Sequence, residues 1–497
     1  MSSEQTLFLG LLAFRVINAL ILQTSFVPDE YWQSIEVAHN MAFSYGAKTW
    51  EWRHGLRGYL YPLIFAIPYK ILGILGLDNR IVLIKLPLLI QAVFAALADV
   101  YLYKLSSKLS GVRVGRWSLL CQLTSWFTFY CAPRTLTNSL ETALTTIAMH
   151  HFPWPGYSRK AHWKYLVLVG VAVVIRPTAA IVWIPMVLWH LRMYFHCFWD
   201  VFRLYVEKGF LILAVSSIID RYFYGKWVYV HLNFLEFNVF SGLGSFYGTH
   251  PWHWYLSQGL AVILGIQLFP FVLAVKNGLQ PTFIKIIAWT VAVYSCLGHK
   301  EFRFIFPILP LAMHLSGLYL ALLLDVSSWL PCSKSSFFVT ILIAGNLPLA
   351  LYTSLIHQRG TLDVMRFIYE ESSRNASLSV VSLMPCHSTP HHGYLHRNIS
   401  LRFLTCEPNL DLVANYTDES DVFYEDPVAW LNKTYATSSL PSHIVMFDVL
   451  LPRVSDFISR NSYEKCAEFF HSHFPRGSSW RLRSGLLFEG VEVVVEI

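Results

Sequence analysis

Long apolar runs separated by short polar loops occupy the first 356 residues of the chain. A helix needs about 20 apolar residues to cross a bilayer core, and shorter segments are tolerated around a cavity, so these runs predict transmembrane helices. Residues 59–77 are also apolar, but Pro62 and Pro68 interrupt them and tyrosines are typical of interfaces, so we expect this segment along the membrane surface. The predicted spans are eleven: residues 7–24, 81–105, 116–132, 136–152, 165–176, 178–195, 209–224, 255–275, 282–298, 304–324 and 336–356.

The composition agrees with a polytopic α-helical membrane protein. Of the 497 residues, 55% are hydrophobic and 14% are charged, whereas about 25% charged is typical of soluble proteins. The net charge of +7 falls in short loops, so it indicates membrane orientation and not nucleic-acid binding. The N-terminus lacks the basic region and the cleavage site of a removable signal, so residues 7–24 are expected to stay as the first span.

Loop charges and sequons predict the orientation. Lysine and arginine gather in the loops of one side, which is therefore cytosolic, together with the N-terminus. The luminal side receives a first loop within residues 25–80, the segments 225–254 and 298–303, and everything after residue 357. Four N-x-S/T sequons lie in that last segment, at Asn375, Asn398, Asn415 and Asn432.

Two domains are predicted from this pattern. Residues 1–356 form a transmembrane domain, and residues 357–497 form a soluble luminal domain of mixed polar and apolar sequence. Residues 379–383 and 491–497 alternate or are rich in β-branched side chains, which predicts strands and a mixed α/β domain. Three cysteines, Cys386, Cys406 and Cys466, permit one disulfide with one thiol left over, and the pairing stays open.

Two adjacent acids, Asp29 and Glu30, directly follow the first apolar run. Pro28 suits the first turn of a helix and the helix dipole favours acids there, so a short helix would begin near Pro28. Gln33 and Glu36 would share the face of Asp29. The pair is either the start of a catalytic site or the cap of an interfacial helix.

Three further groups carry candidate chemistry. Trp50 and Trp52 flank Glu51, where indoles could stack on sugar rings or anchor an interface. His299, Lys300 and Arg303 lie at a membrane boundary and suit a lipid phosphate, although a snorkelling helix end has the same pattern.

Arg134 and Arg176 each interrupt an apolar stretch. Charges at membrane depth usually face a cavity or pair with one another, so these arginines line the same site or hold it together by pairing with Glu141.

A histidine cluster follows Cys386 in the C-terminal domain, at His387, His391, His392 and His396. The spacing matches no standard metal motif, and we expect no metal here.

Two motifs carry a resemblance. Residues 27–39, Val-Pro-Asp-Glu-Tyr-Trp-Gln-Ser-Ile-Glu-Val-Ala-His, and residues 299–304, His-Lys-Glu-Phe-Arg-Phe, resemble the endoplasmic reticulum mannosyltransferases that use dolichyl-phosphate mannose and have the GT-C fold. Many of those relatives carry His-Pro where this chain has Val27-Pro28, which puts in doubt a histidine role there. A closer similarity, to members that add the third, α1,2-linked mannose to the glycosylphosphatidylinositol (GPI) precursor, lies in residues 26–34, 134–138, 247–255, 357–365 and 384–390.

The resemblance implies an inverting transfer from a β-linked donor to an α-linked product. Asp29 would be the base, Glu30 would orient the acceptor or assist Asp29, and His299, Lys300 and Arg303 would bind the donor phosphate. No cofactor and no metal are required. The residues expected to line the acceptor site are Gln33, Trp50, Arg134, Arg176, His250 and His253.

The implied partners are the lipids dolichyl-phosphate mannose and the GPI precursor, in the membrane of the endoplasmic reticulum. Other hypotheses stay open. A related transferase would act on the lipid-linked N-glycan precursor, a transporter would show an internal repeat that this chain lacks, and a non-catalytic subunit of a lipid-glycan complex would need no acid pair after the first span.

Overall fold

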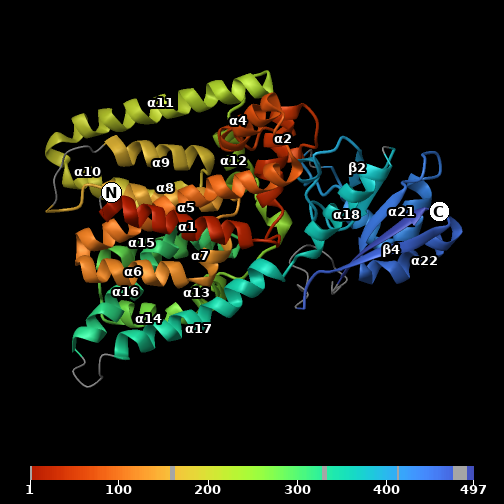
Figure 1. Cartoon of the computed structure of the whole chain (residues 1–497). Coiled ribbons are helices and arrows are strands. Elements are labelled where there is room, and N and C mark those ends of the chain that lie inside the picture. Colours follow the sequence, from red (N-terminus) through yellow and green to blue (C-terminus); the bar gives the residue numbers. More distant parts are fainter. Residues whose placement is uncertain are drawn as a thin grey trace.

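The structure is a computed structural model that describes residues 3–156, 163–326, 333–375, 377–410, 413–473 and 490–496. Figure 1 shows a bundle of helices that carries the N-terminus and a smaller part, with a sheet, that carries the C-terminus. The helices of the bundle are α1 (Ser3–Ile21), α5 (Arg80–Ser110), α6 (Val112–Thr124), α7 (Trp126–Cys131), α8 (Thr137–His151), α9 (Trp163–Ile175), α10 (Ala179–Met193), α11 (Phe198–Tyr224), α13 (Leu260–Leu264), α14 (Leu268–Lys276), α15 (Pro281–Cys296), α16 (Leu309–Val326) and α17 (Ser333–Leu355).

Each predicted span coincides with one helix of the bundle or with a series of consecutive helical segments. Among the described residues, five stretches are long and apolar enough to cross a membrane, beginning at Glu4, Arg80, Tyr255, Phe302 and Ser335. Shorter apolar helices include α9, α10 and α15. The chain therefore has the helices that a polytopic protein needs, and the count of eleven spans stays a prediction.

Two predicted spans break at a turn. The span over residues 116–132 divides at Ser125, whose hydroxyl accepts a hydrogen bond from the Thr128 N–H (3.3 Å) and caps α7. The span over residues 255–275 divides at Gly265, where φ is +54° and a Cβ atom would lie 3.1 Å from Trp126. The two breaks meet, because the Trp126 indole N–H donates to the Val262 carbonyl (2.9 Å).

Helix α4 (Leu60–Leu75) corrects the expectation that prolines interrupt residues 59–77. Pro62 lies in its first turn, where a missing N–H costs nothing, and the helix continues through Pro68. Its buried face, with Tyr61 and Phe65, packs against α2 (Glu36–Phe43). The position of α4 along the membrane surface stays a prediction.

Short helices cap the end of the bundle that faces the sheet. The helix that contains Asp29 starts there and passes into a π-turn, η1 (Tyr31–Ile35), in which the Glu36 N–H donates to the Tyr31 carbonyl. Short elements also occur elsewhere in the bundle: η2 (Phe195–Cys197) connects α10 to α11, and η6 (Gly265–Gln267) connects α13 to α14. The other short elements are α3 (Trp50–Arg53), α12 (Val230–Leu235), η3 (Glu236–Phe240), η4 (Leu243–Tyr247), η5 (Tyr255–Gly259) and η7 (Phe302–Ile308).

The C-terminal domain is mixed α/β, as predicted. Its strand order is β2-β1-β3-β5-β4, with β1 parallel to both neighbours and β5 antiparallel to both of its own. Its elements are α18 (Gly360–Arg374), β1 (Ser379–Leu383), α19 (His392–Leu395), β2 (Ser400–Phe403), α20 (Glu419–Glu425), α21 (Pro427–Thr434), β3 (His443–Phe447), η8 (Asp448–Leu450), α22 (Leu451–Arg460), β4 (Tyr463–Phe470) and β5 (Gly490–Glu496).

A disulfide joins Cys386 to Cys406, and Cys466 is the thiol left over among these three. This resolves the pairing that the sequence left open. The two sulfur atoms lie beside His387, but as a disulfide they offer no thiolate to a metal ion. The four sequon asparagines, at positions 375, 398, 415 and 432, are exposed on this domain.

The C-terminal domain docks directly on the helix that carries Asp29. The buried Glu36 carboxylate accepts hydrogen bonds from the N–H groups of His391 (2.6 Å) and Gly393 (3.1 Å). The Trp32 indole N–H donates to the Thr389 carbonyl (3.1 Å). These bonds fix the short helix that begins near Asp29 against the loop that follows β1.

Candidate active site

A cavity of about 530 Å³ lies beside Asp29, within the size range of ligand pockets of about 300–1,000 Å³. Its charged lining includes Asp29, Glu301 and Arg303, and its apolar lining includes Ile181 on α10 and Val293 on α15. The cavity therefore joins a cluster of charges to the ends of two membrane-type helices.

Asp29 and the 299–303 motif meet in this cavity, as the sequence predicted. Arg303 lies between two acids, with Nη1 2.6 Å from Asp29 Oδ2 and with Nε and Nη2 each 2.7 Å from a Glu301 oxygen. The Asp29 side chain is 27% exposed, so the carboxylate is held by the arginine and still open to the cavity.

His299 completes this network through Glu301, with its Nε2 3.1 Å from Glu301 Oε1. Burial alone would lower the pKa of His299, but the hydrogen bond and the charge of Glu301 raise this pKa above its usual value. Burial likewise tends to raise the pKa of Glu301, but Arg303 and His299 hold it well below its usual range. The network therefore keeps an ionised acid and favours a protonated histidine.

A second pair faces the same cavity. Arg57 Nη2 lies 2.6 Å from Glu51 Oε1, and the Gln33 amide donates to Glu51 Oε2 (3.3 Å). Gln33 and Trp50 line the cavity, as expected, and Trp50 packs against Phe237.

Glu30 does not face this cavity, which corrects its expected role beside Asp29. Glu30 is 1% exposed, and its carboxylate oxygens lie 3.0 and 2.8 Å from Arg134 Nη1. Arg134 also donates to the Thr24 carbonyl (2.6 Å) and to the Tyr130 carbonyl (2.9 Å). Successive helical side chains point about 100° apart, so one acid enters the cavity while its neighbour is buried below it.

Arg176 is the arginine that pairs with Glu141, at 3.1 Å, whereas Arg134 does not contact that acid. Arg176 also lies over the Phe304 ring, 5.1 Å from its centroid, and lines the cavity. Of the two expected arginines, Arg176 is therefore part of the cavity wall and Arg134 is a buried support.

Lys300 turns away from the cavity. Its ammonium donates to the carbonyls of His250 (2.9 Å), Gly298 (3.5 Å) and Leu297, so it ties two loops together. Its neighbours in sequence face the other way because Glu301 has an extended backbone, in which side chains alternate. This arrangement contradicts the expected contact of Lys300 with a phosphate.

The two expected histidines of the 247–255 motif also lie outside the cavity lining. His250 stacks on Trp254 with 4.7 Å between ring centroids, and His253 is exposed and lies 3.2 Å from the Ser257 hydroxyl. Trp52 is buried against Tyr59 and serves packing.

Four ionisable residues of the lining were not among the expected site residues: Glu51, Arg57, Glu301 and His387. Glu301 stands inside the 299–304 motif, from which only the three cations were expected to bind the donor phosphate. His387 comes from the C-terminal domain, packs against Trp32 and has its pKa lowered by burial to about 4. In the sequence, His387 stood out only as a member of the histidine cluster. Other members of this cluster lie at the contact between the C-terminal domain and the helix near Asp29.

The chain matches the model of the Alg9-like mannosyltransferase family over residues 6–396. It is 48% identical to "GPI alpha-1,2-mannosyltransferase 3" of Danio rerio, with 93% of this chain and 86% of that protein aligned. It is 46% identical to the Homo sapiens protein of the same name, with 95% of this chain and 85% of that protein aligned.

The fold is similar to that of ArnT from Cupriavidus metallidurans bound to undecaprenyl phosphate. The TM-score is 0.57 at 12% identity, and the match covers 99% of this chain and 98% of that one. The chain is thus a multi-pass membrane protein with the fold of the GT-C glycosyltransferases.

Proposed function

The chain belongs to the Alg9-like mannosyltransferase family, and on this premise we propose that it adds the third mannose to the GPI precursor. The donor is dolichyl-phosphate mannose, the acceptor hydroxyl is on the second mannose, and the new bond is α1,2. The relatives named for this linkage, at 46–48% identity over most of the chain, support the assignment. Family membership argues against the transporter and scaffold hypotheses.

The observation that carries this proposal is the Asp29 carboxylate, open to a cavity and held by Arg303. An inverting transfer needs a base on one face of the sugar and positive charge at the leaving phosphate on the other. In our proposal Asp29 takes the proton of the acceptor hydroxyl as that oxygen attacks the anomeric carbon. Arg303 positions the carboxylate for this step.

The leaving group is dolichyl phosphate, which gains one negative charge as the glycosidic bond breaks. Arg57, Arg176, His299 and Arg303 supply cations around the cavity. Glu301 raises the pKa of His299 and so favours its protonated form before the donor arrives. Donors fixed in advance toward a developing charge stabilise a transition state without reorganisation.

The apolar lining accounts for a lipid donor. Ile181 and Ile184 on α10 and Val293 on α15 line the cavity, and Ile184 is exposed on the surface of the helix bundle. An isoprenoid chain along these helices would leave its phosphate at the charged end. We propose that the cavity and the C-terminal domain lie on the luminal side of the endoplasmic reticulum membrane, as the loop charges and the exposed sequons support.

The test is a transfer assay with purified full-length protein in lipid nanodiscs. Dolichyl-phosphate mannose is offered with a GPI acceptor that carries two mannoses, and in parallel with a lipid-linked N-glycan precursor. We expect one added hexose on the GPI acceptor, removable by an α1,2-specific mannosidase. Transfer to the N-glycan precursor alone would replace this function with that of the related transferases.

A further inference from the structure

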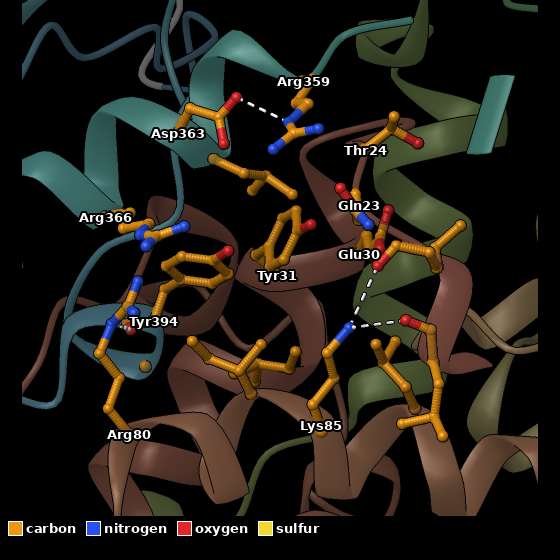
Figure 2. A pocket seen from close by; sticks show the side chains of 17 residues that line it. Gln23, Thr24, Glu30, Tyr31, Arg80, Lys85, Arg359, Asp363, Arg366 and Tyr394 are labelled. Atoms are coloured by element: carbon orange, nitrogen blue, oxygen red, sulfur yellow. Dashed lines mark hydrogen bonds and ion pairs between the residues drawn. The ribbon is translucent and has the colours of Figure 1, made fainter. Parts of the chain in front are cut away.

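A second cavity, of about 400 Å³, lies beside Glu30 and Tyr31, which directly follow Asp29 in the sequence (Figure 2). Glu30 and Tyr31 line this cavity, whereas Asp29 and Trp32 line the active-site cavity. No residue is common to the two linings, so the second cavity is a separate site.

Lys85 and Arg80, both on α5, supply charge to the second cavity without an acid partner. The Lys85 ammonium donates to the carbonyls of Leu20 (3.3 Å) and Leu22 (3.2 Å), and Arg80 Nε donates to the Tyr394 carbonyl (3.0 Å). In the part of the chain that the structure describes, neither side chain forms an ion pair, and the buried Nη2 of Arg80 has no hydrogen-bond partner. The cavity therefore holds two cations that lack an anion.

Two more arginines line the same cavity, Arg366 on α18 and Arg359 directly before that helix. Arg366 lies near the Tyr394 ring on the side of Arg80, so two guanidinium groups come close together (Figure 2). Both arginines are paired with acids on α18, Arg359 with Asp363 at 2.8 Å and Arg366 with Glu370 at 3.2 Å, so the excess of positive charge comes from Arg80 and Lys85. The other acid of the lining, Glu30, is neutralised by Arg134. The excess of positive charge suits a phosphate, which arginine and lysine bind with charge-assisted hydrogen bonds.

Part of the remaining lining is apolar and lies near the outer surface of the helix bundle. Leu20 and Leu22 at the end of α1, and Ile84 and Leu88 in α5, line the cavity. Leu20 is 49% exposed, and Ile81 on the same side of α5 is 65% exposed, so the apolar wall continues onto the outer surface of the bundle. A ligand that fills this cavity would be an amphiphile with an anionic head.

We propose that the second cavity binds the phosphodiester head of an inositol phospholipid, with its acyl chains along α1 and α5. Two lipids offer this chemistry: free phosphatidylinositol and, on the basis of the proposed function, the lipid end of the GPI precursor itself. Bound there, the acceptor lipid is held beside Glu30 and Tyr31 while its glycan reaches the active-site cavity.

Binding of dioleoyl phosphatidylinositol to the full chain is measured by native mass spectrometry in detergent, with phosphatidylcholine and inositol 1-phosphate as comparisons. The test variant is R80Q/K85Q. The matched control is K108Q, because Lys108 lies on the same helix and also donates to a backbone carbonyl, that of His150, at the other end.

We expect wild-type protein to prefer phosphatidylinositol, the double variant to lose affinity by about tenfold or more, and K108Q to match the wild type. Equal binding of phosphatidylinositol and phosphatidylcholine, or unchanged binding by R80Q/K85Q, would overturn the proposal. Displacement of the lipid by inositol 1-phosphate at equal concentration would make this a site for a soluble anion.

A measurement on wild-type protein covers the case in which the double variant does not fold. Phosphatidylinositol, and not phosphatidylcholine, should slow the acylation of Lys85 by an amine reagent, read by peptide mass spectrometry. Lack of protection contradicts the proposal. Both readouts are independent of mannose transfer, and a two-mannose GPI lipid used as the ligand distinguishes the acceptor from free phosphatidylinositol.

Discussion

Replacing Glu30 with alanine should lower the unfolding free energy of the protein, and it leaves the proposed catalytic base, Asp29, in place. Glu30 and Arg134 are both buried, and two contacts of 3.0 and 2.8 Å join them. Removing one partner of a buried ion pair leaves an uncompensated charge, which costs about 3–5 kcal/mol of unfolding free energy. Glu30→Gln keeps one oxygen that accepts from Arg134, so its cost should be about 1.5–3 kcal/mol.

The assay is unfolding in mixed detergent micelles, with mannose transfer measured per folded molecule. The double variant E30M/R134M should lose about 0.5–3 kcal/mol less unfolding free energy than the two single variants lose together. The reason is that the double variant leaves no unpaired charge buried at this position. If the Glu30→Ala variant has normal stability but transfers no mannose, then the structural role assigned to the Glu30–Arg134 pair is wrong and Glu30 takes part in the reaction.

Three other predictions concern the 299–303 motif and the topology. Arg303→Gln should lower kcat/KM by about 10–100-fold, because charge-assisted hydrogen bonds are lost. Lys300→Gln should leave the donor KM unchanged, because Lys300 faces away from the cavity. Equal effects of the two variants on the donor KM would show that Lys300 also binds the donor phosphate. Glu301 raises the pKa of His299, so donor affinity should fall as the pH rises through that raised pKa and His299 loses its charge. In Glu301→Gln this fall in affinity should occur at lower pH. Identical pH profiles of the donor KM in the variant and the wild type would refute this prediction. Endoglycosidase should increase the gel mobility of protein made in cells, and a C-terminus open to protease from the cytosol contradicts the luminal domain. The sequons concerned are Asn375, Asn398, Asn415 and Asn432.

The helices of the bundle could be predicted because each apolar run has the length that a bilayer demands. The breaks at Ser125 and Gly265 could not, since they depend on a contact between segments far apart in sequence, where Trp126 reaches across to Gly265. Runs of apolar residues record burial in lipid or protein and carry little information on where two helices must turn to pass one another.

The 299–303 motif could be located from its charges, but not divided into roles. Extended backbone at Glu301 sends alternate side chains to opposite sides, so His299 and Glu301 share a network that Lys300 does not join. Residue type alone favoured the three cations as ligands of the donor phosphate. An alternating pattern of side chains along extended backbone would instead have placed residues 299, 301 and 303 in one group.

The helix near Asp29 was predicted from the sequence, but the set of side chains expected to share the face of Asp29 was partly wrong. Gln33 lines the cavity with Asp29, whereas Glu36 points to the C-terminal domain. The π-turn over residues 31–35 adds a residue to one turn and rotates the helical residues after it. Arg57 and His387 come from distant segments, and single-sequence patterns do not reveal which distant segments meet.

Turnover by purified Asp29→Asn protein tests the central claim most directly. Asparagine keeps the size of the side chain and an oxygen for Arg303, but it takes no proton from an acceptor hydroxyl. We predict that kcat falls by about 10²–10⁴-fold while the acceptor KM changes little and the protein remains folded. Wild-type kcat in this variant, at normal abundance and stability, would contradict the assignment of Asp29 as the base.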